Sequence, residues 1–461
     1  MLELAGILVL GVIAQWLAWK IKQTAILPLI IIGLLIGPIS TFFTPDGSKL
    51  LDGDQIFSGD LLFSFVSLSV GVILFEGGLT LNLKEVKTVA STVRNLLIVG
   101  VLVTFIGGGL AAYIILDLSV SIALLFGALI IVSGPTVVLP ILRNVRPNAR
   151  INTILKWEGI LIDPLGALIA VLVYEFIKSS SDGNYYTIEA LKDFFTTISI
   201  GFFIGGIGAV LIWYLIGKHK IPDYLKNVFT LGMVILVFTI SDILQKEAGL
   251  LATTIMGIVL ANLKLEDFKK ILSFKEDISL ILVTLLFILL SSRIEIVQIE
   301  KLGYRSLLLF GVVILVIRPL GVWLSAIGSN LRWRETLFIA WIGPRGIVAA
   351  AVASLFSLDL INSTSNSVKI RSDAELLLPL VFLVIVGTVV LQGTSAKWIG
   401  KILGVLRKEP QGVLFVGANE LSKKLALYLK KQGFFVLLAD TAKHNVQEAR
   451  KLNLPVYEGN I

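Results

Sequence analysis

The sequence contains no cysteine and only two histidines, which excludes several kinds of functional site. Without cysteine there are no disulfide bonds, thiolate zinc sites or cysteine nucleophiles. The histidines, His219 and His444, lie in polar segments that contain lysine, as solvated side chains do, so neither is expected to be a ligand. The sequence also lacks an HExxH motif, a serine and histidine pairing and a metal-binding cluster. We therefore expect that the protein is not an enzyme.

Apolar residues dominate what is present. The chain of 461 residues is 56% hydrophobic with a mean hydropathy of +0.90, far above the mix of a soluble globular protein. Apolar runs of span length recur along most of the sequence, which predicts a polytopic helical membrane protein. The first residues, MLELAG, carry no basic stretch, so we expect a retained first span rather than a cleaved signal peptide. The net charge of +8 resides in the loops, so the expected partner is the lipid bilayer and not nucleic acid.

We predict thirteen spans and their orientation. The spans are residues 2–19, 24–43, 60–80, 91–116, 119–142, 151–178, 194–217, 225–243, 248–263, 277–292, 302–327, 334–357 and 375–400. Lysine and arginine concentrate in every second loop. Because such residues mark the cytoplasmic side, the N-terminus is expected outside and the C-terminus inside, in the cell (inner) membrane of a prokaryote.

The predicted spans 119–142 and 334–357 each carry a Gly-Pro pair within the apolar run. One contains Gly134-Pro135 and the other Gly343-Pro344. Proline removes a helical donor and glycine permits non-helical angles, so each helix is expected to break, although either alone would also fit a simple kink. The two spans are seven apart, and an odd separation inverts the second copy. Matching breaks in inverted halves predict two discontinuous helices and a transport site near the midplane.

Four ionisable residues lie inside spans near these breaks: Glu76, Glu158, Asp163 and Arg345. A charge at the bilayer centre costs about 2.5–3.5 kcal/mol on insertion scales, so such residues are usually functional or paired. Asp163 is the one polar member of a small-residue helix face, made of Gly159, Asp163, Gly166, Ala167 and Ala170. Glu158 points about 140° away from it. We therefore expect Glu158 to form a structural ion pair with Arg345.

Asp163 is the expected carrier. A single carboxylate holds either a proton or a small cation, so the two compete for it. A hard monovalent cation prefers oxygen ligands, which Ser133 and Thr136 of the first break are placed to supply. Glu76 is either a further ligand or a packing residue.

Residues 1–405 resemble the monovalent cation:proton antiporters of the NhaP and sodium/proton exchanger type. That family carries its transport aspartate in E-S-x-x-N-D, which EGILID matches through Glu158 and Asp163. Its T-D-P break, G-x-R-G break and F-E-x-G-L segment match Ser133-Gly134-Pro135, Gly343-Pro344-Arg345-Gly346 and the segment around Glu76, respectively. The resemblance implies the NhaA-like antiporter fold, in which the two discontinuous helices cross. It also implies a homodimer with a panel-like dimerisation domain and a six-helix core that moves like an elevator. It also implies one-for-one exchange of Na⁺ or K⁺ for H⁺, as in pH homeostasis.

The sequence departs from that family at three ligand positions. The usual span 5 aspartate is Gly134, the usual serine ligand is Gly159, and the usual asparagine is Ile162. Fewer side-chain ligands remain, so water or backbone oxygen must complete the ion's shell. The choice among Na⁺, K⁺ and Li⁺ stays open.

After a linker at 406–411, residues 412–461 change in character. The pattern there predicts a β-α-β-α-β order, like half of a Rossmann-like nucleotide-binding fold. It resembles the N-terminal part of regulator-of-potassium-conductance domains. Gly417 matches the first fingerprint glycine, Asn419 and Ser422 replace the others, and Asp440 stands where a ribose contact is expected. A nucleotide such as NAD(H), ATP, ADP or AMP is a possible ligand here, whereas transport itself is expected to need no cofactor.

A different class of protein is the alternative. A potassium channel or efflux protein gated by a cytosolic nucleotide-binding ring would fit the tail. A channel, however, would want a carbonyl filter such as T-V-G-Y-G, and Gly-Thr-Val-Val at 387–390 is a poor match.

Overall fold

The structure of the chain is a computed structural model that describes residues 2–21, 24–46, 48–51, 59–180, 186–263, 268–293, 296–362, 368–407 and 412–459. The chain forms two compact units, Met1–Leu406 and Arg407–Ile461. Residues 408–411 of the predicted linker lie outside the described residues.

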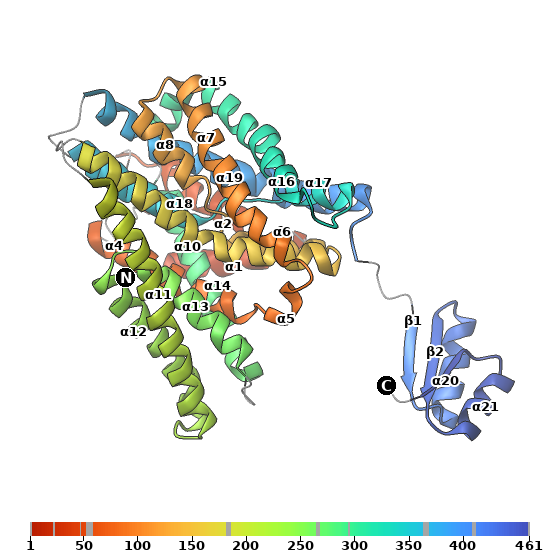
Figure 1. Ribbon diagram of the computed structural model, residues 1–461. Helices are drawn as coiled ribbons and strands as arrows, with labels where there is room; N and C mark the ends of the chain where they lie inside the picture. The colour runs from red at the N-terminus through yellow and green to blue at the C-terminus, as the bar shows by residue number, and fades with distance from the viewer. Residues whose placement is uncertain are drawn as a thin grey trace. The chain divides into compact units, whose positions relative to one another are not determined.

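The first unit is built of helices (Figure 1). In chain order they are α1 (Leu2–Ile21), α2 (Ile26–Ile36), η1 (Pro38–Phe42), α4 (Gly59–Leu79), α5 (Leu83–Val86), α6 (Ala90–Asn95), η2 (Leu96–Gly100), α7 (Val101–Leu116), α8 (Val120–Leu129), α9 (Pro135–Val145), α10 (Ala149–Ser180), α11 (Tyr186–Gly217), η3 (Asp223–Leu225), α12 (Lys226–Leu244), α13 (Ala248–Asn262), α14 (Phe268–Ser292), α15 (Ile296–Val312), η4 (Val313–Ile317), α16 (Arg318–Ala326), α17 (Trp333–Trp341), α18 (Ile347–Asn362) and α19 (Val368–Leu403). Among the described residues, six helical segments are long and apolar enough to cross a membrane, and further apolar helices are shorter. The unit is therefore a mostly helical membrane protein, and the number of thirteen spans stays a prediction.

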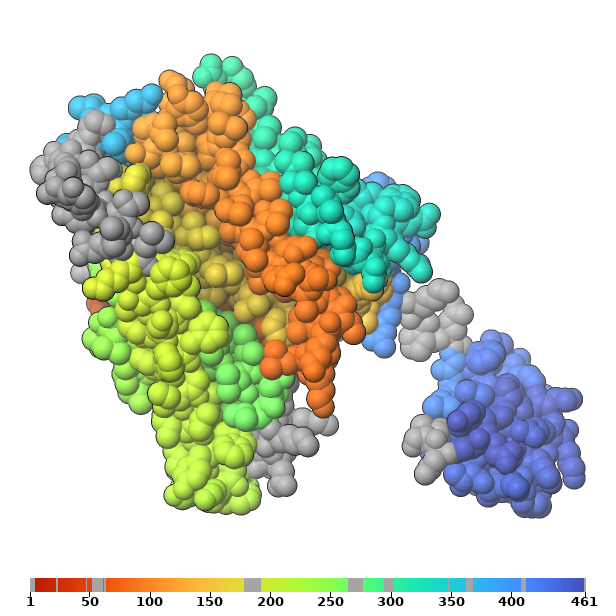
Figure 2. All heavy atoms as spheres, in the orientation of Figure 1, coloured from red at the N-terminus to blue at the C-terminus, as the bar shows by residue number. Residues whose placement is uncertain are grey.

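The helices leave apolar side chains on the outside. On α7, Leu102, Ile106, Leu110 and Ile114 recur every fourth residue and are each more than half exposed. This is the reverse of a soluble helix, which buries its apolar stripe. Figure 2 shows α7 (orange) running beside α15 and α16 (teal) on this surface. Such a face is suited to contact with lipid.

The backbone leaves the helix at Gly134-Pro135 and at Gly343-Pro344. Between α8 and α9 the non-helical segment is 130–134, and between α17 and α18 it is 342–346. We call these segments break 1 and break 2. In each case an apolar run long enough for one span is divided into two short helices, as the loss of helical donors and the glycine freedom predict.

The helix before each broken span contains a matching irregular turn. A π-helical turn, η2, joins α6 to α7, and a second, η4, joins α15 to α16. The two helices pack together, because α7 contacts η4 and α16 contacts η2. π-Helical turns are rare, and they occur frequently at functional sites. Two of them at corresponding positions fit the pattern of repeated halves.

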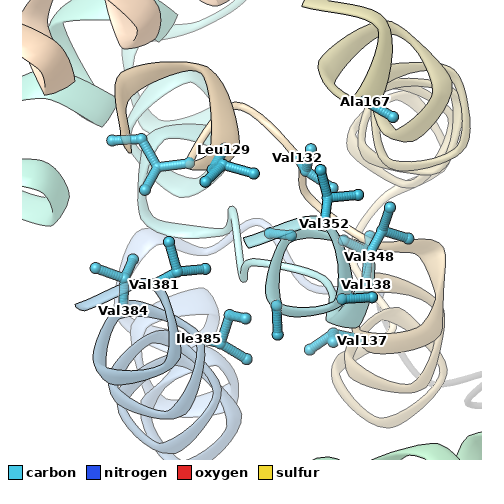
Figure 3. Close-up of a cluster of buried hydrophobic side chains, with 14 of the residues drawn as sticks. Leu129, Val132, Val137, Val138, Ala167, Val348, Val352, Val381, Val384 and Ile385 are labelled. Carbon is cyan, nitrogen blue, oxygen red and sulfur yellow. The ribbon is translucent and has the colours of Figure 1, made fainter. Parts of the chain in front are cut away.

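An apolar core surrounds the two breaks (Figure 3). It gathers side chains from five helices and break 1, among them Leu129, Val132, Val137, Val138, Ala167, Val348, Val352, Val381, Val384 and Ile385. The small-residue face of α10 packs on this cluster. A Cβ on Gly159 would lie 3.2 Å from Val138 Cγ2, and one on Gly166 would lie 2.5 Å from Val132 Cγ2. The glycines thus let break 1 and α9 approach α10 closely.

The second unit has the predicted order of elements. Strands β1 (Gly412–Val416), β2 (Phe435–Asp440) and β3 (Val456–Glu458) are parallel and ordered β1-β2-β3. Helices α20 (Glu420–Lys431) and α21 (Lys443–Lys451) connect them. Buried Ala426, Val436, Leu438 and Ala449 form the centre of its small core.

Candidate ion-binding site

The two breaks touch backbone to backbone. A Cβ on Gly134 would lie 2.8 Å from Cα of Gly346, a separation that real Cβ atoms do not show. The N–H of Gly346 points to the carbonyl oxygen of Val132 at 3.4 Å. Residues more than two hundred positions apart therefore form one crossing, and only glycine fits where the two segments meet.

The carboxylate of Asp163 lies at this crossing. The side chain is 1% exposed. Its Oδ2 lies 3.6 Å from the position of a Cβ on Gly134, and its Oδ1 lies 3.5 Å from that of a Cβ on Gly346. Thr136 Oγ1 lies 3.0 Å from the same Gly134 position. Within the part of the chain that the structure describes, Asp163 Oδ1 and Thr136 Oγ1 are buried and have no hydrogen-bond partner.

The other two expected ligands are buried nearby in the fold. Ser133 belongs to break 1, next to Gly134, and is 2% exposed. Glu76 lies on α4, where the neighbouring Gly77 faces Ile160 of α10 at 3.2 Å from its potential Cβ. The role of either as an ion ligand stays a prediction.

The half-helix ends around the crossing are compensated by charge. The N-terminal ends of α9 and α18 carry positive dipole ends, and Asp163 lies beside both. At the C-terminal end of α8, Arg345 Nη1 donates to Ile131 O at 3.2 Å. At the end of α17, Arg318 Nη2 donates to Ile342 O at 2.8 Å. Two arginines thus offset the two negative ends, and one carboxylate faces the two positive ends.

The partner of Glu158 differs from the expected one. Arg318 binds the Glu158 carboxylate with both nitrogens, Nη1 to Oε1 at 2.5 Å and Nη2 to Oε2 at 3.0 Å. Both side chains are buried. Among the described residues Arg318, and not Arg345, is within ion-pair distance of Glu158, so the predicted pairing was wrong. The sequence signal for Arg318 was available, because it also lies inside an apolar span, directly before Pro319.

Packing accounts for the missing family ligands. At Gly159 the space for a side chain is filled by Val138. At Gly134 it is filled by the backbone of Gly346. Ile162, in place of the usual asparagine, is buried in an apolar cluster with Val101 and Ile131. At each of the three positions, therefore, packing against break 1, α9 or break 2 occupies the surroundings of the residue that replaces a ligand.

In the second unit, Asp440 binds its own chain. Its Oδ1 accepts from Ala442 N at 2.8 Å, and its Oδ2 accepts from Ala418 N at 2.7 Å and from Asn445 Nδ2 at 2.8 Å. These donors, the Ala442 and Ala418 N–H groups first, hold the pKa of the Asp440 carboxyl below its usual value. Gly417 directly follows β1 and has φ +95°, a conformation that favours glycine. The carboxylate joins the loops after β1 and β2, and a nucleotide contact there stays a prediction.

Known proteins are similar to this chain in sequence and in fold. The sequence matches the family described as "Sodium/hydrogen exchanger, transmembrane" over residues 6–402. Na(+)/H(+) antiporter 1 of Methanocaldococcus jannaschii is 27% identical over 370 residues, 78% of this chain and 83% of that relative. K(+)/H(+) antiporter NhaP of Alkalimonas amylolytica is 24% identical over 401 residues, 85% of this chain and 66% of that relative. The solved structure of the sodium proton antiporter MjNhaP1 from M. jannaschii at pH 8 is similar with a TM-score of 0.74 and 26% identity, covering 87% of this chain and 98% of that one. The chain belongs to the sodium/hydrogen exchanger family.

Proposed function

We propose that this protein exchanges a monovalent cation, Na⁺ or K⁺, for protons, and that the two ions compete for Asp163. The family and its sodium and potassium antiporter relatives support exchange rather than a channel. The observation that carries the site is the buried Asp163 carboxylate at the crossing, with Oδ1 and the nearby Thr136 Oγ1 free of partners among the described residues.

The chemistry follows from the ligands. Bound cation requires the ionised carboxylate and further oxygen atoms, for which Thr136, Ser133 and backbone carbonyls are available. A bound proton requires the carboxylate alone. Because one carboxylate cannot hold both, a site that opens in turn to each side carries a cation one way and a proton the other. With one such group we expect one-for-one, electroneutral exchange.

The assembly and orientation are part of the same proposal. We expect a homodimer of the exchanger type, with the N-terminus outside and the C-terminus in the cytoplasm. The basic loops of alternate spans support that orientation. The thirteen-span arrangement with inverted halves is supported by the two matched breaks and the two matched π-helical turns.

The test is transport in vesicles. The purified protein is reconstituted with a pH-sensitive dye, and Na⁺, K⁺ or Li⁺ is added at several pH values. The native chain should move protons on addition of its cation, and Asp163→Asn should not, although it reconstitutes equally. Asp117→Asn, at an exposed helix end, serves as the matched control and should transport normally. A full proton response from Asp163→Asn would refute the proposal.

For the second unit we propose a nucleotide ligand that regulates exchange. Its parallel strands, the φ of Gly417 and the position of Asp440 at the end of β2 support this. Thermal unfolding of the full chain with NAD(H), ATP, ADP or AMP tests it. A rise in unfolding temperature that depends on concentration with one of them is expected, and no change with any of them would count against the proposal.

A further inference from the structure

Two side chains of α19 hold break 2 from outside the ion site. Thr388 Oγ1 accepts a hydrogen bond from the backbone N–H of Arg345 at 3.1 Å. Gln392 Oε1 accepts one from the N–H of Gly343 at 3.0 Å. Both side chains are 1% exposed. Since they are four residues apart, they lie on one face of α19, one turn from each other.

These bonds answer a need that the break creates. Backbone N–H groups in a non-helical buried segment have lost their helical acceptors, and an unpaired buried donor costs about 1–3 kcal/mol. Bilayer depth offers no bulk water to replace the acceptor. For two N–H groups of break 2 the acceptor comes from α19. The backbone path of residues 343–345 is therefore set by α19 and not by the segment alone.

The constraint reaches break 1 through Arg345. Thr388 holds the backbone of Arg345, and the Arg345 side chain donates to Ile131 O in break 1. The next residue, Gly346, packs on Gly134, and its potential Cβ lies 3.5 Å from Asp163 Oδ1. A shift of residues 343–346 would therefore move Gly346 and, through its contact, Gly134, and both lie beside the Asp163 carboxylate.

We propose that Thr388 and Gln392 are positioning residues for cation binding, a role that rests on the proposed exchange at Asp163. They hold the crossing in the geometry that brings oxygen atoms together around a cation, and they do not touch the ion. A proton needs only the carboxylate, whereas a cation needs several oxygen atoms at set distances. Loss of either bond should therefore weaken cation binding more than it changes the maximal exchange rate.

The variants are chosen to remove one acceptor at a time. Thr388→Val keeps the shape and loses the acceptor, whereas Thr388→Ser keeps the hydroxyl. Gln392→Met keeps the length and loses the amide oxygen. Thr394→Val is the matched control, because exposed Thr394 lies on the same helix and bonds only to its carbonyl oxygens, at 2.7 Å for Val390 O. Thr388 makes the same kind of bond to Ile385 O at 2.9 Å, so the control accounts for its loss.

The measurement is the half-saturating concentration of Na⁺ and of K⁺, with the maximal rate, in dye-loaded vesicles. Thr388→Val and Gln392→Met should each raise the half-saturating concentration roughly two- to tenfold, which is the effect of one lost hydrogen bond. The maximal rate should be retained. Thr388→Ser and Thr394→Val should match the native chain. Thermal unfolding in detergent verifies that each variant is folded, and Gln392→Met carries the test if Thr388→Val does not fold.

Three outcomes would overturn the positioning role. They are unchanged half-saturation in both variants, an equal effect of Thr394→Val, or a Thr388→Ser that behaves like Thr388→Val. Asp163→Asn in the same vesicles separates this result from failure of the proposed function. Exchange that persists in Asp163→Asn refutes the site itself, whereas an inactive Asp163→Asn with unchanged half-saturation in the α19 variants refutes only the positioning role.

Discussion

Gly134 and Gly346 meet so closely that a Cβ on Gly346 would lie 2.6 Å from both the Cα and the N of Gly134. The contact joins break 1 to break 2 at the Asp163 carboxylate. Because both atoms belong to the backbone, neither can rotate out of the way. The site therefore depends on the absence of a side chain at two positions as much as on the side chains present.

The first prediction concerns this contact. Gly346→Ala should destabilise the protein by about 1–3 kcal/mol, the usual cost of overpacking, and should abolish exchange by separating the breaks. Thermal unfolding and vesicle transport measure the two effects. Gly206→Ala on α11 is the control, because nothing lies within 4 Å of its potential Cβ. A Gly346→Ala variant with native stability and transport would show that the crossing is looser than this contact indicates.

The second prediction concerns Thr136. Thr136→Val removes the unpartnered Oγ1 and keeps the volume, so a cation loses one oxygen ligand while the carboxylate still holds a proton. The half-saturating cation concentration should rise roughly tenfold, as for a lost interaction with a charged group. Thr136→Ser should restore native values. The vesicle assay at a single pH measures this, and an unaltered response of Thr136→Val to both Na⁺ and K⁺ would exclude the hydroxyl as a ligand.

The third prediction tests which of the two buried arginines, Arg318 or Arg345, pairs with Glu158. Removing one partner of a buried ion pair costs about 3–5 kcal/mol, because the other charge is left buried. Glu158→Gln and Arg318→Met should each lower the unfolding temperature markedly, and the double variant should lose less than their sum. The cycle of Glu158→Gln with Arg345→Met should show much weaker coupling. Stronger coupling to Arg345 than to Arg318 would contradict the observed pairing.

The fourth prediction concerns acid and the second unit. Since the folded-state pKa of Asp440 lies below its usual 3.8, the ionised carboxylate stabilises the fold above that value. This stability is lost as pH falls from about 3.8 through the lower folded-state pKa. The full chain is incubated at several pH values and then labelled with deuterium at one fixed pH. The protection of residues 412–459 against hydrogen–deuterium exchange should fall in that window.

Asp440→Asn provides the comparison for the acid prediction. It should be less protected at neutral pH, because a neutral amide accepts these N–H bonds more weakly than a carboxylate does. It should also change less between neutral and acid pH. Asn445→Ala, which removes one of the donors, should fall between the two. An Asp440→Asn variant with native protection and native acid dependence would place the acid-sensitive group elsewhere in the unit.

Local features of the sequence predicted much of the membrane unit. Apolar runs indicated a polytopic helical protein because burial in lipid requires them. The Gly-Pro pairs located both breaks, since the missing donor and the glycine freedom act within a turn of the residue itself. The small-residue face of α10 indicated how Asp163 would meet another segment, and break 1 and α9 pack on that face.

Long-range partners were decided only by tertiary structure. The sequence offers two intramembrane arginines and no distance to Glu158, and packing brings Arg318 to it across 160 residues. Thr388 and Gln392 look like ordinary polar residues of a long helix until the unpaired N–H groups of break 2 lie opposite them. Composition and local chemistry determined the kind of protein, its breaks and its candidate carrier. The tertiary structure decided which arginine pairs with Glu158, which side chains accept from break 2 and which glycines contact each other. Those contacts depend on where distant helices pack.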